Sequence, residues 1–186
     1  MLHEVVLAGF GGQGVMSMGQ LLAYAGMLQD YHVSWLPSYG PEQRGGTANC
    51  AVIISDEPVG APVVNHPTAA IVLNNPSFDK FEPTVLPDGI LIVNSALIDR
   101  KSTRTDIQVI EIPANDIAAQ LGNTQIANMI LLGAFIELTK AVSIDAILES
   151  LKKVLPERRH HLIPLNKQAL EKGAELCREH LLQAAI

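Results

Sequence analysis

Short apolar runs that alternate with helix-like segments constrain this chain more than any other feature of its sequence. Residues 4–9 (EVVLAG) form a short apolar run that ends in glycine, which is typical of a buried strand. Residues 13–29 then carry apolar side chains at helical spacing, and further apolar runs follow at 69–74 and 88–94. This order of strand, helix and strand predicts a mostly parallel sheet with helices on both faces.

The remaining segments fit a single α/β domain. Residues 31–36 and 48–55 are predicted strands, and we expect Pro37 to end the first of them. Four helical segments are predicted after the last strand, over 114–121, 125–140, 143–154 and 165–182. We therefore expect residues 1–186 to form one Rossmann-like domain with a helical C-terminal extension.

Composition excludes several classes of function. The 186-residue chain has a net charge of −6, which argues against nucleic acid or an anionic membrane as its main partner. Its two cysteines form no C-x-x-C motif, so we expect no iron–sulfur cluster, structural zinc or other metal held by this chain alone. No apolar run reaches the roughly 18 residues that span a membrane, and no signal peptide is recognised. These features predict a cytoplasmic protein.

Gly9, Gly11 and Gly14 spell G-x-G-x-x-G directly after the first predicted strand. Such glycines permit a tight turn, a close approach of backbone to phosphate, and close packing of helix on strand. Gly12 adds further backbone freedom, and Gln13 places a neutral donor at the start of the helix. The free N–H groups and positive dipole end of that helix favour an anion here.

The rest of a dinucleotide-binding signature is missing. An acidic residue should end the second strand and bind the ribose hydroxyls, but the residues there are Trp35, Leu36 and Pro37. Asp30 precedes that strand, at its opposite end, and no Walker lysine follows the glycines. Two interpretations remain open: the loop binds an anionic ligand other than NAD, or its glycines only let the helix pack closely on the sheet.

A second loop, SYGPEQRGGTANC (38–50), follows the second predicted strand. In a doubly wound sheet it is expected at the carboxyl edge, beside the first glycine loop, where ligands bind. Arg44 can clamp a phosphate or carboxylate, and the adjacent Gly45 and Gly46 allow a close approach of backbone. Glu42 can orient Arg44 or pair with a partner chain. The alternative is a solvated ion pair within the loop, which the adjacent Gly45 and Gly46 and the position of the loop make less favoured.

Together, GFGGQG (9–14) and SYGPEQRGGTANCAVIIS (38–55) resemble the gamma subunit of 2-oxoacid:ferredoxin oxidoreductases, and most closely the 2-oxoglutarate type. The resemblance extends through 73–98, 122–135 and 165–175, and so covers nearly the whole chain. It implies an enzyme of the EC 1.2.7 class that converts a 2-oxoacid and coenzyme A to acyl-CoA and carbon dioxide, and passes electrons to ferredoxin. For 2-oxoglutarate the product is succinyl-CoA.

The resemblance also implies a division of labour among subunits. Thiamine diphosphate with Mg²⁺ and the iron–sulfur clusters are expected on other chains, namely the alpha, beta and ferredoxin-like delta subunits. This sequence agrees, because it has no G-D-G motif and no cluster of cysteines; Asn74-Asn75 is read as a strand end and helix cap. The sequence therefore assigns no catalytic residue and no cofactor to this chain alone, and the isolated chain is expected to be inactive.

Three hypotheses follow. The first is a required subunit that supports assembly and lines the coenzyme A pocket, through residues Gly9, Gly11, Gly12, Gln13, Gly14, Glu42, Arg44, Gly45 and Gly46. The second is a purely structural subunit whose glycine loops contact only partner chains. The third is a self-sufficient nucleotide-binding Rossmann oxidoreductase, against which the missing acidic residue argues.

Overall fold

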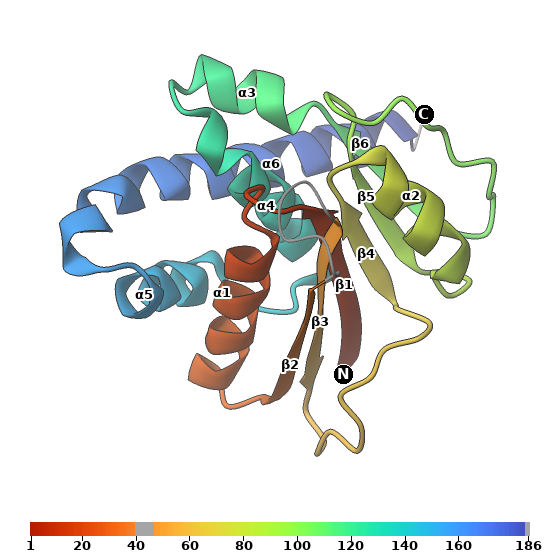
Figure 1. Ribbon diagram of the computed structural model, residues 1–186, viewed down its shortest axis with the longest axis horizontal. Coiled ribbons are helices and arrows are strands. Elements are labelled where there is room, and N and C mark those ends of the chain that lie inside the picture. The colour runs from red at the N-terminus through yellow and green to blue at the C-terminus, as the bar shows by residue number, and fades with distance from the viewer. Residues whose placement is uncertain (40–46, 185–186) are drawn as a thin grey trace.

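The structure is a computed structural model that describes residues 1–39 and 47–184 (Figure 1). Its centre is a six-stranded sheet with the strand order β2-β3-β1-β4-β5-β6. β1, β4, β5 and β6 run parallel to one another, whereas β3 is antiparallel to both β1 and β2. The strands are β1 (Leu2–Phe10), β2 (His32–Tyr39), β3 (Thr47–Ser55), β4 (Ala69–Val72), β5 (Ile90–Asn94) and β6 (Gln108–Ile112). The predicted α/β fold with a mostly parallel sheet is thus confirmed.

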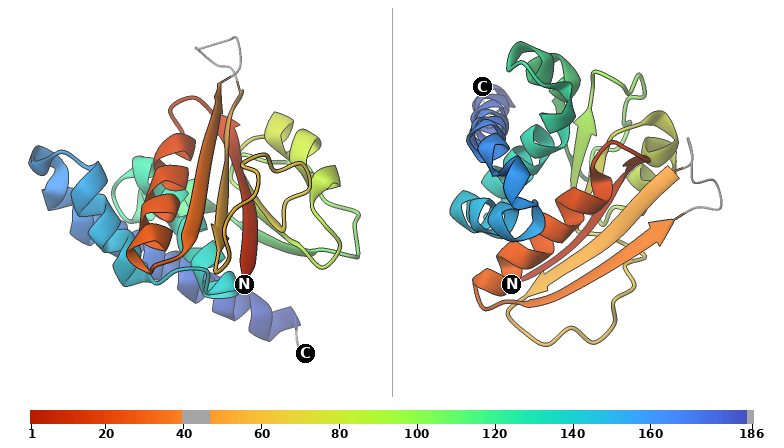
Figure 2. Two further views of the ribbon diagram at one scale, coloured as in Figure 1. Left: turned by 90° about the horizontal axis from the view of Figure 1, so that it is seen from below. Right: turned by 60° about the vertical axis from the view of Figure 1, so that its left-hand side comes forward.

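The described helices cover both faces of the sheet unequally (Figure 2). α1, α4, α5 and α6 lie on one face and share its large apolar core, while α2 and the residues after it cover β4 and β5 on the other face. The α-helices are α1 (Val15–Leu28), α2 (Asn75–Phe81), α3 (Ala114–Gln120), α4 (Ala127–Thr139), α5 (Ile144–Val154) and α6 (Ile163–Ala184). Short 3-10 helices are η1 (Glu82–Thr84), η2 (Thr124–Ile126) and η3 (Glu157–Leu162). Helices on both faces were predicted, and so was the helical C-terminal third.

The prediction that Pro37 ends the second strand is wrong. β2 continues through Pro37 to Tyr39, and Pro37 lies opposite Cys50 of β3. Because β2 is at the edge of the sheet, one side of the strand has no ladder hydrogen bonds to lose, and a proline is tolerated there. β1 and β2 therefore end at the same edge of the sheet, with β3 inserted between them.

Local capping explains where several helices begin. The Asn74 side chain accepts a hydrogen bond from the Ser77 N–H at 2.8 Å, and Pro76 lies in the first turn, as the sequence predicted. Ser143 caps α5 in the same way, accepting from the Ala146 N–H at 3.1 Å. Among the described helices, none has the length and apolar character needed to cross a membrane.

α4 is buried on nearly all sides, and α6 crosses it at very short range. A Cβ added at Gly133 of α4 would lie 2.7 Å from the carbonyl carbon of Leu170 in α6. A Cβ added at Gly173 of α6 would lie 2.8 Å from the carbonyl carbon of Ile130 in α4. The backbones of the two helices are therefore in direct contact, and each glycine makes room for the other helix.

Candidate functional site

The glycine loop connects the end of β1 to the start of α1, at the carboxyl edge of the parallel strands (Figure 1). Gly12 has φ 90° and Gly14 has φ 78°, which side chains of other residues rarely adopt. A Cβ at Gly14 would also lie 2.5 Å from the Asn128 Nδ2 atom. A Cβ at Gly11 would meet no described atom within 4 Å, so this glycine faces open space. Gly12 also faces open space, but only Gly11 of the two could carry a side chain without a strained φ.

Gln13 shapes the loop from within. Its Oε1 atom accepts a hydrogen bond from the Phe10 N–H at 2.6 Å, and its own N–H donates to the Phe10 carbonyl at 3.2 Å. Its Nε2 atom donates to the Leu73 carbonyl at 3.4 Å. Gly9 allows this arrangement, because a Cβ there would lie 2.5 Å from the Gln13 Oε1 atom. The amide that the sequence suggested as a ligand donor is thus engaged with the backbone of the loop.

The amino end of α1 points its backbone donors toward this loop. Gly14 is the N-cap residue and supplies no side-chain hydrogen bond, and the first turn contains no acidic residue. A 14-residue helix carries a partial positive charge at this end, and its first N–H groups have no partners within the helix. This arrangement is compatible with an anionic group at the loop, one of the two interpretations that the sequence leaves open.

A cavity of about 200 Å³ lies beside the loop. Its walls combine the loop with the start of α4 and with the residues before it, and they are mostly neutral and polar. The lining residues are Gly12, Gln13, Leu73, Asn115, Thr124, Gln125, Ala127 and Asn128. The cavity supplies hydrogen-bonding amides and a hydroxyl without any ionised side chain.

Two buried or half-buried amides hold the walls of this cavity in place. Asn128 donates to the Gly14 carbonyl at 3.3 Å, which fastens α4 to the glycine loop. Asn94 is fully buried; it donates to Asn115 Oδ1 at 2.8 Å and accepts from the Ala114 N–H at 3.2 Å. Sequence reasoning missed Asn115, Thr124, Gln125 and Asn128, because they are far from the glycine motif in the chain. The only available signal was the polar stretch NTQIAN (123–128), placed before a strongly apolar helix.

The second predicted loop falls largely outside the described residues. Glu42, Arg44, Gly45 and Gly46 are among the positions that the structure does not describe. Its two ends are described: β2 finishes at Tyr39, and β3 begins at Thr47, which lies opposite Phe10 of β1. The segment therefore leaves and re-enters the sheet at the edge that carries the glycine loop, as the sequence predicted for its position.

The described residues offer no centre for redox or metal chemistry. Within residues 1–39 and 47–184, no group of three or more His, Cys, Asp or Glu side chains is placed to hold a metal ion. Both cysteines are buried and free, and burial raises the pKa of the Cys50 thiol to about 12. Thiolate chemistry at Cys50 is therefore suppressed. A set of ligands for Mg²⁺ with thiamine diphosphate, or for an iron–sulfur cluster, is not found in the described part of the chain.

Comparison with known proteins identifies the class to which this fold and loop belong. Residues 4–176 match the family described as pyruvate ferredoxin/flavodoxin oxidoreductase, and the chain belongs to that family. Within it, the chain corresponds to the gamma subunit of 2-oxoacid:ferredoxin oxidoreductases. The supporting structure is that of the gamma subunit of the keto/oxoacid ferredoxin oxidoreductase from Geobacter sulfurreducens, with a TM-score of 0.80 and 28% identity over 95% of this chain and 99% of that one. The predicted family is confirmed.

Relatives in the family carry the names of different oxoacids. The ketoisovalerate oxidoreductase subunit VorA of Methanothermobacter thermautotrophicus is 39% identical over 96% of this chain, which spans only 37% of the VorA length. The 2-oxoglutarate synthase subunit KorC of Methanocaldococcus jannaschii is 34% identical and is matched over 96% of both chains. The 2-oxoglutarate:ferredoxin oxidoreductase of Magnetococcus marinus shares the fold, with a TM-score of 0.86 at 21% identity over 96% of this chain and 31% of that one.

Proposed function

We propose that this chain is the gamma subunit of a multi-subunit enzyme that converts 2-oxoglutarate and coenzyme A to succinyl-CoA and carbon dioxide, and reduces ferredoxin. The observation that carries this proposal is the match to KorC, a 2-oxoglutarate synthase subunit, from end to end at 34% identity. VorA is more similar in sequence and is named for ketoisovalerate. A branched oxoacid is therefore the second candidate substrate.

The proposed role of the chain is to bind part of coenzyme A and to support assembly. Open space at Gly11, the amino end of α1 and a neutral polar cavity favour an anionic, hydrogen-bonding ligand at the loop. Arg44, with Glu42, Gly45 and Gly46, would complete the site by clamping an anionic group of the ligand. The Magnetococcus enzyme has been solved with 2-oxoglutarate, coenzyme A and succinyl-CoA bound, which supports this choice of ligand.

The reaction itself would take place on partner subunits. We assign thiamine diphosphate, Mg²⁺ and the iron–sulfur clusters to alpha, beta and ferredoxin-like delta chains, because the described residues of this chain offer no ligands for them. Two alternatives remain to be tested. A purely structural subunit would use its glycine loop only for partner backbone, and a self-sufficient oxidoreductase would bind NAD or NADP.

Purification from the native cell is the first test. A tagged chain isolated without oxygen should be measured as an intact complex by native mass spectrometry. We expect larger chains that carry thiamine diphosphate and an iron–sulfur subunit. The complex is then assayed with 2-oxoglutarate, pyruvate and ketoisovalerate, and the highest kcat/KM identifies the oxoacid. A chain that purifies alone, or with NAD bound, contradicts the proposal and revives the self-sufficient oxidoreductase.

Kinetics of the assembled enzyme test the coenzyme A site. Arg44→Ala should raise the KM for coenzyme A about tenfold, with a much smaller effect on the KM for the oxoacid, since a charge-assisted contact is lost. Arg158→Ala, an exposed arginine on η3, is the matched control and should change neither. Equal effects on both substrates refute the binding role and leave the subunit role intact.

Gly11→Ala separates the ligand-binding subunit from the purely structural one. The described structure has room for this methyl group, so assembly should be normal while the KM for coenzyme A rises. Arg158→Ala, the exposed arginine on η3, is again the control and should behave as the wild type. A reduced yield of complex with unchanged kinetics supports the structural subunit instead.

A further inference from the structure

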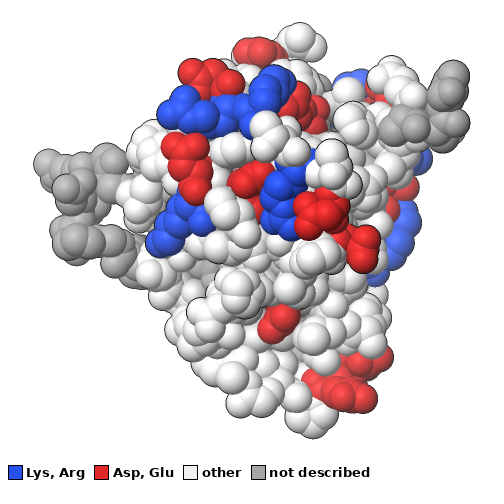
Figure 3. Space-filling view, turned by 90° about the vertical axis from the view of Figure 1, so that its right-hand side faces the viewer, with Lys and Arg blue, Asp and Glu red and all other residues white. Residues whose placement is uncertain are grey.

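Cationic side chains are distributed very unevenly along this chain. Every Lys and Arg except Arg44 follows residue 79. Residues 1–39 and 47–67 therefore carry no Lys or Arg, and their charged side chains are those of the acidic residues Glu4, Asp30, Asp56 and Glu57. In Figure 3 the lowest part of the surface is almost uncharged, with isolated acidic groups and no basic ones. Charged residues are depleted at the centres of protein–protein interfaces, compared with the rest of the protein surface.

None of the described helices packs on the side of β2 and β3 that faces away from α1, whereas α2 contacts β1 and the segment after β3 passes beside Glu4 and Ile53. α1 covers the other side of these strands, where Cys50, Val52 and Ile54 are buried. The turned view in Figure 2 (right) shows β3 and β2 at the boundary of the molecule, with α1 along one side of them. We call the other side of β2, β3 and β1 the open sheet face.

The open sheet face presents apolar side chains to solvent. Leu36 is 40% exposed, and its cross-strand neighbours Ala51 and Val6 are also apolar. Leu2, at the start of β1, is 54% exposed, and Val63, after β3, is 58% exposed. Phe10, at the end of β1, is 36% exposed and directly precedes Gly11 of the glycine loop. Neutral polar side chains, among them Ser38 and Asn49, lie between these apolar residues. Several large exposed apolar side chains on one side of a sheet, among neutral polar ones, fit a binding surface.

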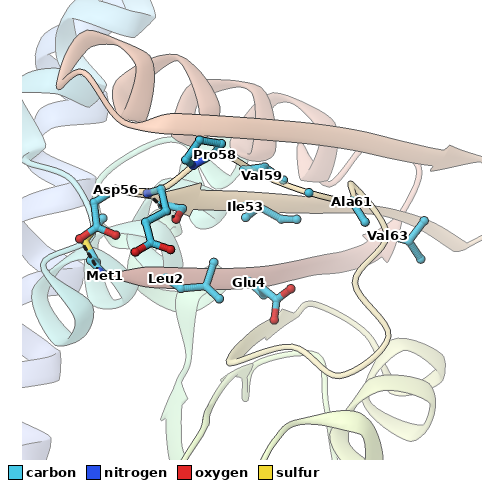
Figure 4. Close-up of a pocket in the computed structure, with 12 residues that line it drawn as sticks. Met1, Leu2, Glu4, Ile53, Asp56, Pro58, Val59, Ala61 and Val63 are labelled. Carbon is cyan, nitrogen blue, oxygen red and sulfur yellow. Dashed lines mark hydrogen bonds and ion pairs between the residues drawn. The ribbon is translucent and has the colours of Figure 1, made fainter.

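A groove of about 440 Å³ lies at the opposite end of the open sheet face (Figure 4). It is formed by the start of β1 and the end of β3 together with the segment that follows β3. Leu2, Ile53 and Val63 supply apolar walls, and Glu4 and Glu57 supply carboxylates. Asp56 pairs with the amino group of Met1, whereas Glu4 and Glu57 form no ion pair with any residue that the structure describes.

We propose that the open sheet face is the contact surface for another subunit of the assembled enzyme, and that the partner inserts a basic side chain into the acidic groove. The partner that fits presents an apolar surface against Leu36 and Phe10. Its Lys or Arg lays its aliphatic part along Leu2 and Ile53 and brings its cation to Glu4 and Glu57. Charge complementarity selects this partner, because the open sheet face carries carboxylates and no Lys or Arg among its described residues.

This interface would also complete the candidate functional site. Phe10 belongs to the open sheet face and is adjacent in sequence to Gly11, so a partner seated there reaches the edge that carries the glycine loop. The proposal rests on the proposed function, since it assumes a multi-subunit enzyme. It goes beyond that function by naming the surface, its anchors and the chemistry of the partner.

Paired substitutions in the tagged chain, expressed in its native cell, test the apolar half of the interface. Leu36→Lys should reduce the larger subunits that co-purify by at least roughly tenfold, because it places a charge in an apolar contact. Met27→Lys is the control: Met27 is 60% exposed but lies on α1, on the other side of the sheet, and the complex should remain intact. Circular dichroism melts of the isolated chains confirm that both variants fold.

Charge reversal and cross-linking test the acidic groove. Glu57→Lys should weaken the complex and reduce its dependence on salt, whereas Glu179→Lys on α6 should not. A water-soluble carbodiimide should join Glu4 or Glu57 of the wild-type complex to a lysine of the partner. If the Leu36 and Glu57 variants co-purify with the larger subunits as well as the wild type does, the proposed interface is wrong but the proposed function is unaffected. A chain that purifies without larger subunits, or that forms only a homodimer through Leu36, overturns both.

Discussion

The close crossing of α4 and α6 makes a quantitative prediction. Gly133→Ala would place a Cβ 2.7 Å from the carbonyl carbon and 2.8 Å from the Cα of Leu170, where a carbon–carbon contact requires about 3.5–4.0 Å. The obstacle is backbone rather than a flexible side chain, so the two helices must move apart by about 1 Å. That movement loosens contacts among the buried residues on both helices.

Two opposing effects set the change in the free energy of unfolding that Gly133→Ala should cause. Overpacking of a core costs typically about 1–3 kcal/mol, and a clash with backbone belongs at the upper end of that range. Alanine restores up to about 1 kcal/mol, because glycine is a poor helix former. We expect a net loss of about 2 kcal/mol in the free energy of unfolding, which lowers the Tm by roughly 4–8 °C for a chain of this size.

Urea unfolding followed by circular dichroism measures this loss, with Gly60→Ala as the control in open space. Gly173→Ala should behave like Gly133→Ala, because its Cβ would lie 2.8 Å from the carbonyl carbon of Ile130. The double variant should lose less than the sum of the single variants, since one separation of the helices relieves both clashes. Unchanged midpoints for both single variants, or strict additivity, would refute the assignment of these glycines to a shared backbone contact.

Three further predictions concern buried polar and ionisable groups. Iodoacetamide at pH 8 should leave Cys50 unmodified until the protein unfolds, because its pKa is about 12; labelling of the native chain, measured by mass spectrometry, would contradict this. Hydrogen bonding and charge from Lys140, followed by Arg178, lower the pKa of Glu137 below that of the unfolded chain. Ionised Glu137 therefore stabilises the fold above about pH 4.5, and this contribution is lost as the pH falls through the lowered pKa of the folded chain. At pH 7, Glu137→Gln should unfold at a lower urea concentration than the wild type. The difference between the two midpoints should shrink in acid. Asn94→Ala leaves the Ala114 N–H and the Asn115 side chain without their partner and should cost about 1–3 kcal/mol in urea unfolding. Asn123→Ala removes only the solvent-exposed hydrogen bond that caps η2 and should cost less.

Much of the fold could be predicted because its signals are local. Apolar runs of strand length, helical spacing, and caps such as Asn74 and Ser143 depend only on neighbouring residues, and these elements lie close to their predicted bounds. The order of the strands depends on long-range pairing, which local patterns do not contain. The insertion of β3 between β1 and β2 was therefore not predicted, nor was the passage of β2 through Pro37, which depends on the strand being at an edge.

The candidate site likewise has a part that local sequence predicts and a part that depends on long-range packing. The glycine loop was predicted because its motif is contiguous, and the structure gives separate reasons for Gly9, Gly12 and Gly14. The opposite wall of the cavity comes from η2 and α4, more than a hundred residues further along the chain, where the sequence offers only the polar stretch 123–128 and no ligand-binding motif. For Gln13, the sequence predicts a side-chain donor near the ligand. It does not predict that the Gln13 amide forms hydrogen bonds with the Phe10 N–H and the Leu73 carbonyl instead.

The hydrogen bond from Asn128 to the Gly14 carbonyl has a consequence for how the protein matures in the cell. A ribosome releases the glycine motif first and Asn128 much later, so β1 and α1 emerge long before the residue that fastens their junction. The junction reaches its final form only once α4 has been synthesised and has docked. Any step that depends on the finished junction of β1 and α1 must therefore wait until the chain has been synthesised past residue 128.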